Sequence, residues 1–316
     1  MPDASPSSAS SGAQAASPAP TPGAADQSHP SPTNAGTKPT SVAPPELVVF
    51  DKVTKSFGEG PDKRVAVQDV SFVVHDVPNV GELIAIVGPS GCGKSTVLRI
   101  IAGLRPHFPP TSGEVKLFGK PIERPGADRG MVDQKYSLMP HLTVADNIGF
   151  GLMLRGVPSK DRRARAHEWA KKVGLEGAED KYPSELSGGM QQRVAIAATL
   201  ILEPKVLLMD EPFGALDPKI RMQMQELLVQ LWKEQQATVF IVTHSVEEAI
   251  YLGDRIFRMA AKPGRLVEIL RAPRPSVSPE VMRKQPWLGE LTQELLRRLE
   301  TDAPALGELP GIERWH

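Results

Sequence analysis

Hydrophobic positions alternate between strand-like and helix-like spacing from residue 47 to residue 243. Short runs rich in Val, Ile and Phe predict strands at Leu47–Val53, Arg64–Val74, Glu82–Val87, Val115–Phe118, Val206–Met209 and Thr238–Thr243. Apolar residues at helical spacing predict helices at Ser95–Leu104, Asp161–Lys172 and Gly188–Leu202, and a fourth that Asp217 caps and Pro218 begins. Strands that alternate with helices predict an α/β fold with a mainly parallel sheet.

The two ends of the chain differ from this pattern. Residues 1–45 are nearly all Pro, Ser, Ala, Thr and Gly, and Asp3, Asp26 and Lys38 are the only charged side chains before Glu46. Such a segment cannot bury enough apolar surface to offset its ordering entropy, so it is predicted to be a disordered tail. A dispensable tail is favoured over a tether or partner-binding segment.

Residues 271–316 form a short C-terminal extension. Its leucines recur at helical spacing and predict one amphipathic helix; they are Leu288, Leu291, Leu295 and Leu299. A leucine stripe usually faces a core, so packing on its own subunit is favoured over a partner or membrane role. Residues 46–270 are therefore expected to form the main folded domain, with a mostly helical part at about 136–200.

Composition narrows the functional classes. The chain has 316 residues and a formal net charge of zero, which gives no support to a general nucleic-acid binder. Cys92 is the only cysteine, so no disulfide within the chain exists and a reducing compartment is expected. No apolar run reaches the roughly 18–20 residues that span a bilayer, and the N-terminus carries no apolar signal segment. If the protein acts at a membrane, another chain is expected to supply the membrane-spanning segments.

A glycine-rich loop follows the predicted strand Glu82–Val87. Residues 88–95 read GPSGCGKS and match G-x-x-x-x-G-K-[ST], with a strand before and a helix after. Glycines let backbone N–H groups surround phosphate oxygens, and the helix N-terminus adds a positive dipole end. Lys94 is expected to reach the β- and γ-phosphates of a nucleotide, and the Ser95 hydroxyl to bind Mg²⁺. Cys92 is interpreted as a small residue tolerated at a variable position of the loop, in preference to a redox-active thiol.

Two carboxylates follow the fully apolar strand Val206–Met209. Asp210 and Glu211 are costly at the end of a buried strand unless a cation neutralises them, and Mg²⁺ near Ser95 would do so. Asp210 is then expected to bind the metal. Glu211 is expected to act as general base or to orient the attacking water. A surface turn is the alternative, and the phosphate loop argues against it because both halves of a metal site occur together.

The segment Leu186–Arg193, LSGGMQQR, opens the helix before the acidic strand and identifies a family. It resembles the signature of ATP-binding cassette (ABC) proteins. The resemblance covers about residues 47–270 and implies a P-loop cassette: a mixed, mainly parallel core sheet, an N-terminal antiparallel β-subdomain and a helical subdomain. It also implies ATP and Mg²⁺ as cofactors and hydrolysis of ATP in a homodimer.

The resemblance also assigns roles to single residues. Gln134 resembles the Q-loop glutamine, which senses Mg²⁺ and contacts the transmembrane partner. His244 resembles the switch histidine that contacts the γ-phosphate, and Phe57 takes the place of the aromatic that stacks on adenine. The implied nucleotide-binding residues are Phe57, Gly88, Pro89, Ser90, Gly91, Cys92, Gly93, Lys94, Ser95, Thr96, Ser187, Gly188, Gly189 and the D-loop residue Asp217. The implied catalytic residues are Lys94, Gln134, Glu211 and His244, and the implied metal ligands are Ser95, Gln134 and Asp210.

Two positions depart from the family pattern. Asp133 precedes Gln134 where relatives usually carry an aromatic or apolar residue, and an acid there is expected to alter the partner contact or the metal response. Ser245 follows His244 where Asp is common. Neither departure removes a group that hydrolysis needs.

Several segments are similar to those of importers of nitrate, sulfonate, taurine and bicarbonate. These are Pro125–Gly130, Pro212–Asp217, Tyr251–Arg255 and Lys262–Arg265. The chain is therefore predicted to couple ATP hydrolysis to solute import through a separate integral-membrane permease, and indirectly to serve a solute-binding protein. It would lie at the cytoplasmic face of the inner membrane, with no nucleic-acid partner. The alternatives are the ATPase of an exporter and a soluble, non-transport ABC ATPase.

Overall fold

The computed structural model describes residues 44–77, 81–135, 137–272, 281 and 284–301. All of them belong to one compact unit, Ala43–His316. The predicted tail therefore lies outside the described residues except for its last two. No helix in the described part of the chain is both long and apolar enough to span a bilayer.

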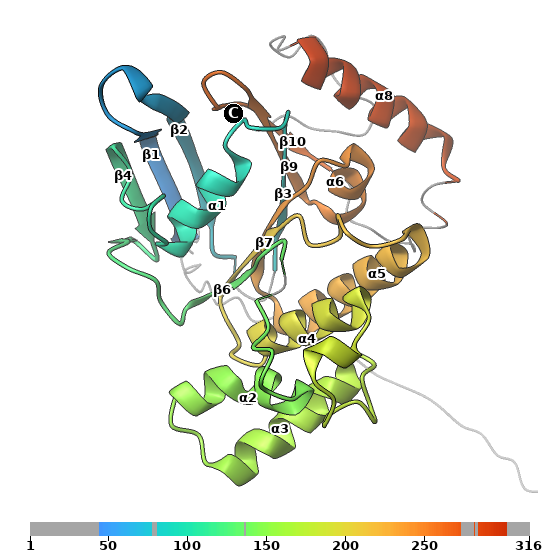
Figure 1. Cartoon of the computed structure of the whole chain (residues 1–316). Helices are drawn as coiled ribbons and strands as arrows, with labels where there is room; N and C mark the ends of the chain where they lie inside the picture. Colours follow the sequence, from blue (N-terminus) through green and yellow to red (C-terminus); the bar gives the residue numbers. More distant parts are fainter. Residues whose placement is uncertain (1–43, 78–80, 136, 273–280, 282–283, 302–316) are drawn as a thin grey trace, which may run out of the picture. The chain divides into compact units, whose positions relative to one another are not determined.

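A six-stranded sheet forms the centre of the unit (Figure 1). Its strand order is β10–β9–β3–β8–β7–β6, and only the β10–β9 pair is antiparallel. The strands are β3 (Leu83–Val87), β6 (Arg129–Val132), β7 (Val206–Asp210), β8 (Thr238–Val242), β9 (Arg255–Ala260) and β10 (Arg265–Arg271). Because neighbouring strands are parallel, the loops after β3, β6, β7 and β8 leave the same edge of the sheet, which is where ligands bind in open α/β sheets.

Both faces of this sheet are covered, as its nearly continuous apolar strands require. Alternate residues of β3 enter different core clusters: Leu83 and Ala85 join one, and Ile84 and Ile86 the other. The first cluster also contains residues of α2 (Val144–Leu154), α3 (Ser159–Lys172), α4 (Gly188–Leu200), α5 (Pro218–Gln235), α6 (Val246–Leu252) and α8 (Pro286–Thr301). The second contains residues of α1 (Lys94–Ala102) and of a second, smaller sheet.

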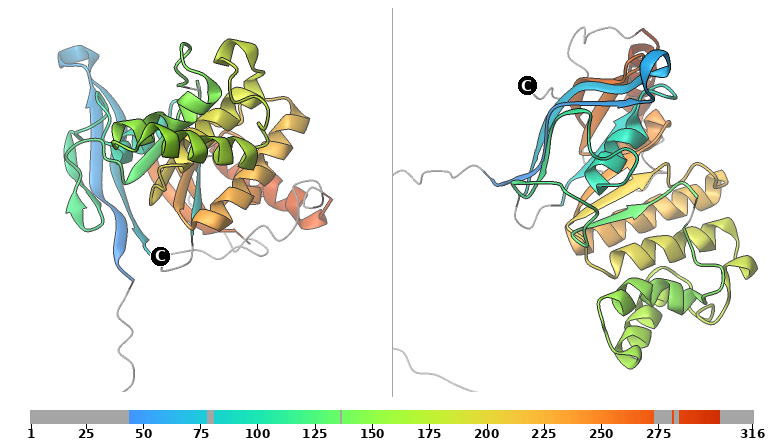
Figure 2. Two further views of the ribbon diagram at one scale, coloured as in Figure 1. Left: turned by 90° about the horizontal axis from the view of Figure 1, so that it is seen from below. Right: turned by 60° about the vertical axis from the view of Figure 1, so that its left-hand side comes forward.

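The smaller sheet is antiparallel and has the order β2–β1–β4–β5. Its strands are β1 (Glu46–Phe57), β2 (Arg64–His75), β4 (Ser112–Leu117) and β5 (Lys120–Pro121), and the short 3-10 helix η1 (Gly60–Asp62) lies between β1 and β2. Helices α2 and α3 lie at the opposite end of the unit from β1 and β2, as Figure 1 and the right-hand view of Figure 2 show. A second 3-10 turn, η2 (Pro183–Glu185), precedes α4. The predicted α/β architecture is confirmed.

Helix α8 packs against α6, and three of the four predicted leucines are buried there. Leu288, Leu291 and Leu295 join the first core cluster, and Leu299 packs against it with part of its surface exposed. The leucine stripe thus faces its own subunit, as expected. Residues 302–316 of the extension lie outside the described part.

Three strands of the large sheet are not predicted from the sequence. β6 is four residues long and contains Gly130, so it lacks a strand-like run. β9 has the sequence RIFRMA, and all six residues are buried, Arg255 and Arg258 included. Arginine side chains are rarely buried unless an acidic partner pairs with them, so a strand with two arginines is not recognised as a buried strand from its sequence. Arg255 is paired with Glu82 at 2.5 Å, and Arg258 with Glu268 of β10 at 3.1 Å, so these long-range pairs are what allow the strand.

Candidate functional site

The glycine-rich loop lies between β3 and α1. Gly93 adopts φ +90°, and a Cβ atom there would collide with the Val67 side chain and the Ala66 carbonyl, so only glycine fits. The Lys94 ammonium turns back into the loop and donates to the Gly88 carbonyl at 2.8 Å and the Pro89 carbonyl at 3.2 Å. A buried cation therefore stands at the start of a helix, within a ring of backbone groups.

Cys92 belongs to the same loop and is fully buried. A Cβ on Gly88 would collide with its sulfur atom at 2.6 Å. The thiol thus fills a small internal space, which agrees with the expectation of a small residue at this position.

Asp210 ends β7 next to the phosphate loop. Its Oδ1 accepts a hydrogen bond from the Ser95 hydroxyl at 2.8 Å, and its Oδ2 lies 3.1 Å from Arg99 Nη2. Burial raises the pKa of the Asp210 carboxyl above its usual range; the hydrogen bond from Ser95 and the charge of Arg99 oppose that rise, and the nearby carboxylates of Glu211 and Asp133 add to it. A buried carboxylate of this kind gains stability from a cation.

Glu211, Gln134 and His244 meet beside Asp210. The amide Nε2 of Gln134 donates to Glu211 Oε2 at 2.9 Å, and His244 Nδ1 lies 3.6 Å from the same oxygen. They follow β6, β7 and β8, so the parallel sheet brings together residues that are far apart in the sequence. Glu211 has φ +47°, an uncommon conformation for a residue with a side chain, and such strained residues cluster at active sites.

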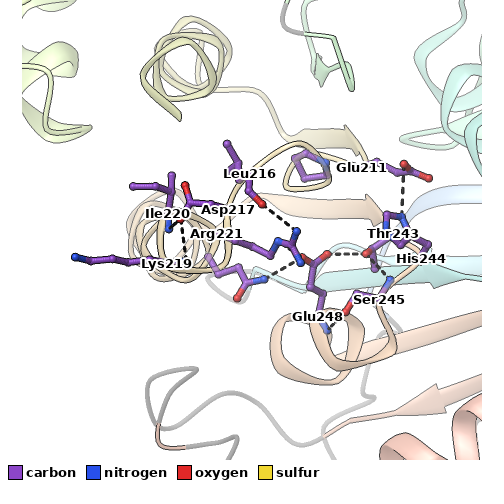
Figure 3. A network of polar contacts seen from close by, with 12 residues as sticks. Glu211, Leu216, Asp217, Lys219, Ile220, Arg221, Thr243, His244, Ser245 and Glu248 are labelled. Carbon is purple, nitrogen blue, oxygen red and sulfur yellow. Dashed lines mark hydrogen bonds and ion pairs between the residues drawn. The ribbon is translucent and has the colours of Figure 1, made fainter. Parts of the chain in front are cut away.

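A buried polar network lies beneath this site (Figure 3). Glu248 of α6 accepts hydrogen bonds from the Thr243 hydroxyl at 2.6 Å and the Gln225 amide at 3.1 Å. Arg221 of α5 lies 3.8 Å from Glu248 and donates to the Leu216 carbonyl at 3.0 Å. The network therefore joins the turn that carries His244 to the loop ahead of α5.

The predicted signature residues lie elsewhere in the fold. Ser187 caps α4 and accepts from the Met190 amide at 3.4 Å. Helices α4 and α1 pack on opposite faces of the large sheet, as their membership of different core clusters shows. Asp217 caps α5 by accepting from the Lys219 and Ile220 amides, each at 3.1 Å. The structure does not bring Ser187 or Asp217 into contact with the phosphate loop of their own chain.

Phe57 ends β1 and is partly exposed. The His107 ring meets it edge-on, with ring centroids 5.2 Å apart and an interplanar angle of 77°, and the Lys55 ammonium lies 5.3 Å from its centroid. Burial, together with the charges of Arg99 and Lys55, lowers the pKa of the His107 imidazole. Phe57 thus lies between the Lys55 ammonium and the His107 ring.

Arg99, Arg221 and Glu248 are site residues that were not predicted from the sequence. Arg99 follows Ser95 by four residues on α1, and this spacing puts both side chains on one face of the helix, toward the acidic strand. The four-residue spacing from Ser95 could therefore have identified Arg99 from the sequence. Arg221 and Glu248 meet only because α5 and α6 pack on the same face of the sheet, which no local pattern reveals.

The comparisons with known proteins agree with this geometry. The ABC transporter family model matches residues 67–214. An uncharacterized ABC transporter ATP-binding protein of Methanocaldococcus jannaschii is 47% identical over 255 residues, which cover 79% of this chain and 93% of that protein.

The chain belongs to the ABC transporter family.

Further relatives of this ABC protein have a named function or a solved structure. The taurine import ATP-binding protein TauB of Escherichia coli is 46% identical over 207 residues, 66% of this chain and 78% of TauB. A dimeric ABC cassette bound to ADP and Pi, in a post-hydrolysis state, is 34% identical with a TM-score of 0.62, and covers 72% of this chain and 99% of that one. CbiO1 of Clostridium perfringens, part of an ABC transporter complex, is 28% identical with a TM-score of 0.63, and covers 81% of this chain and 98% of that one. The expected family and ATPase activity are confirmed.

Proposed function

We propose that this ABC ATPase drives the uptake of a small sulfonate such as taurine through a separate permease. The observation that carries the proposal is the meeting of Gln134, Asp210, Glu211 and His244 at one edge of the parallel sheet, beside the phosphate loop. The similarity to TauB supports the solute class, because TauB is a taurine import protein.

The phosphate loop would hold the nucleotide. Backbone N–H groups of Gly88 and of residues 90–93 would face the phosphates, Lys94 would pair with the β- and γ-phosphates, and Phe57 would stack on adenine. The Ser95 hydroxyl, the Asp210 carboxylate and the Gln134 amide are the oxygen ligands that Mg²⁺ prefers, and Asp210 is a buried acid next to Ser95, so these residues fit the ion. When bound, Mg²⁺ neutralises phosphate charge.

Glu211 would orient the water that attacks the γ-phosphate. Its carboxylate is held by Gln134 from one side and faces His244 on the other, so its position depends on both neighbours. His244 is mostly exposed, with 63% of its side-chain surface accessible, which leaves the imidazole available to the γ-phosphate. Hydrolysis then follows from positioning and charge neutralisation.

Two copies of the chain would complete each site. The signature residues Ser187, Gly188 and Gly189 start α4, on the sheet face opposite α1, so one chain cannot close them over its own nucleotide. In a head-to-tail dimer they face the partner's ATP, and Asp217 approaches the two-fold axis. The dimeric cassettes among the similar structures support this arrangement.

The permease would dock beside Gln134. A cavity of about 300 Å³ lies between β6, α2 and α4. Apolar residues dominate its lining, among them Met131, Leu138, Met139, Phe150 and Leu202. An apolar hollow next to the Gln134 segment suits an inserted helix, and exposed Met153 and Leu154 end α2 nearby. Through such a permease the protein would sit at the cytoplasmic face of the inner membrane and serve a solute-binding protein.

Uptake measurements test the proposal in cells. Deletion of the encoding gene should abolish uptake of labelled taurine or a related sulfonate, and plasmid-borne wild-type protein, but not the Glu211→Gln variant, should restore it. Nitrate and bicarbonate uptake measured in parallel decide the solute class. Unchanged uptake of all these solutes, with loss of solute efflux, would support the exporter alternative instead.

A further inference from the structure

Asp133 lies directly beside the acidic end of β7. β6 and β7 pair in parallel with Val132 opposite Met209, so the next residues along each strand, Asp133 and Asp210, are neighbours. The aromatic or apolar side chain expected at this position from the family pattern would carry no charge. A second acid instead adds negative charge next to Asp210, and this is one of the causes that raise the Asp210 pKa.

Arg99 forms ion pairs with both Asp133 and Asp210. Arg99 Nη2 lies 3.1 Å from Asp210 Oδ2 and 3.5 Å from Asp133 Oδ1. Asp210 is nearly buried, with 6% of its side chain accessible, whereas Asp133 is 37% accessible. The guanidinium can therefore change its main partner from the buried acid to the exposed one with little movement of α1.

Arg99 competes with any cation that approaches Asp210. Ser95 and Asp210 are the proposed Mg²⁺ ligands, and they already contact each other through the Ser95 hydroxyl. A divalent ion at this place would repel the Arg99 charge, since like charges a few ångströms apart repel strongly in a partly buried site. Arg99 must then move off Asp210, and that move costs less if another carboxylate accepts it.

We propose that Asp133 is a positioning residue that takes over Arg99 when Mg²⁺·nucleotide binds, and that it lowers the magnesium concentration at which the site fills. The inference rests on the proposed magnesium site. It assigns a role to the departure from the family pattern at this position. Asp133 acts through Arg99 and touches neither metal nor nucleotide.

The test measures binding rather than turnover. The affinity of the full-length protein for a fluorescent, non-hydrolysable ATP analogue is titrated with Mg²⁺. Asp133→Asn should raise the half-saturating Mg²⁺ concentration by about three- to tenfold, the size expected for a partly exposed charge pair. Affinity without Mg²⁺ should be unchanged, and Asp133→Glu should restore the wild-type value.

Two controls separate the mechanism from general electrostatics. Asp128→Asn removes an equally exposed charge just before the other end of β6 and should shift the midpoint by less than about twofold. With Arg99→Gln as background, Asp210 no longer needs to release a cation, so adding Asp133→Asn should have almost no further effect. Thermal melting and Mg²⁺-free binding check that each variant folds.

The outcomes are distinguishable. If the wild-type affinity does not respond to Mg²⁺, the proposed magnesium site fails and the inference fails with it. If the wild type responds but Asp133→Asn responds alike, the inference alone is overturned. An equal shift with and without Arg99 also overturns it, because the effect would then be a direct one of the Asp133 charge. Should Arg99→Gln not fold, Arg99→Met, which keeps much of the aliphatic stem without the charge, takes its place in the same comparison.

Discussion

At the scale of single residues, the site depends on a few carboxylates with different surroundings. Asp210 is buried between a hydroxyl and an arginine, whereas Glu211 is held by an amide and faces an exposed imidazole. Asp210 and Glu211 are adjacent in the sequence, but their different surroundings suit different proposed roles: metal ligand for Asp210 and water-orienting group for Glu211.

Glu211→Gln should lower ATP hydrolysis by about 10²–10⁴, the usual effect of losing a general base, and should leave ATP binding intact. Lys94, Ser95 and Asp210 still hold the nucleotide in this variant. Phosphate release under single-turnover conditions and equilibrium ATP binding measure the two effects. Glu247→Gln changes an exposed acid on α6 and serves as the control. Near-normal turnover of Glu211→Gln would remove the role given to Glu211.

At the scale of elements, buried polar contacts fix how helices sit on the sheet. Glu248 connects α6 to α5 and to the end of β8 through Gln225 and Thr243. Arg298 of α8 pairs with Glu268 of β10 at 2.8 Å, and its carbonyl accepts from Arg258 of β9 at 2.9 Å. Such groups cannot lose one member without leaving others unsatisfied in the interior.

Glu248→Ala should lower the free energy of unfolding by about 1–3 kcal/mol, because the Thr243 hydroxyl and the Gln225 amide lose their buried acceptor. Turnover should fall too, since the turn carrying His244 loses its support. Urea denaturation and steady-state ATPase assays measure both. Glu247→Ala, one residue earlier and exposed, should change stability by less than about 0.5 kcal/mol. Equal effects of the two variants would contradict a role for the network.

Arg298→Ala should destabilise the protein by about 1.5–3 kcal/mol, because Glu268, with 4% of its side chain accessible, loses one of two buried arginine partners and keeps Arg258 at 3.1 Å. Arg297 is the matched control: Arg298 and Arg297 each contact Glu294 at 2.8 Å, but Arg297 is 53% accessible. Arg297→Ala should cost no more than about 1 kcal/mol. Denaturation curves of both variants test the difference, and similar midpoints would show that α8 does not depend on the buried pair.

At the scale of the whole molecule, the separation of the signature segment from the phosphate loop is the basis of the proposed two-chain site. Helices α1 and α4 occupy opposite faces of the large sheet, so Ser187 lies apart from Lys94 within a chain. A complete site is expected only where two chains meet.

Ser187→Arg should block ATP-dependent dimerisation and spare ATP binding to the monomer, because a bulky cation replaces a small cap at the proposed interface. Sedimentation velocity of Glu211→Gln with and without ATP should show a monomer-to-dimer shift, and the double variant should show none. Ser159→Arg, at the start of α3, is a control at an exposed position. A Glu211→Gln protein that stays monomeric at high ATP and protein concentrations would count against the composite site.

The sequence by itself determined the chemistry and the fold class. Three motifs could be recognised from consecutive residues alone: the phosphate loop at residues 88–95, the acids after Val206–Met209 and the segment that begins at Leu186. Each is a local structure, namely a loop, a strand end and a capped helix start. The strands that read as apolar runs were also found, with ends shifted by one to a few residues. Strand β9 was missed because its two arginines are stabilised only by partners at Glu82 and Glu268.

Only the tertiary structure decided which side chains act together. Sheet register places Asp133 beside Asp210, and helix packing brings Glu248 to Gln225 and Arg298 to Glu268. These partners are separated in the sequence, and no periodicity relates them. The proximity of Asp133 to Asp210 follows from the parallel pairing of β6 with β7, which is a property of the folded sheet and sets the charge around the proposed metal site.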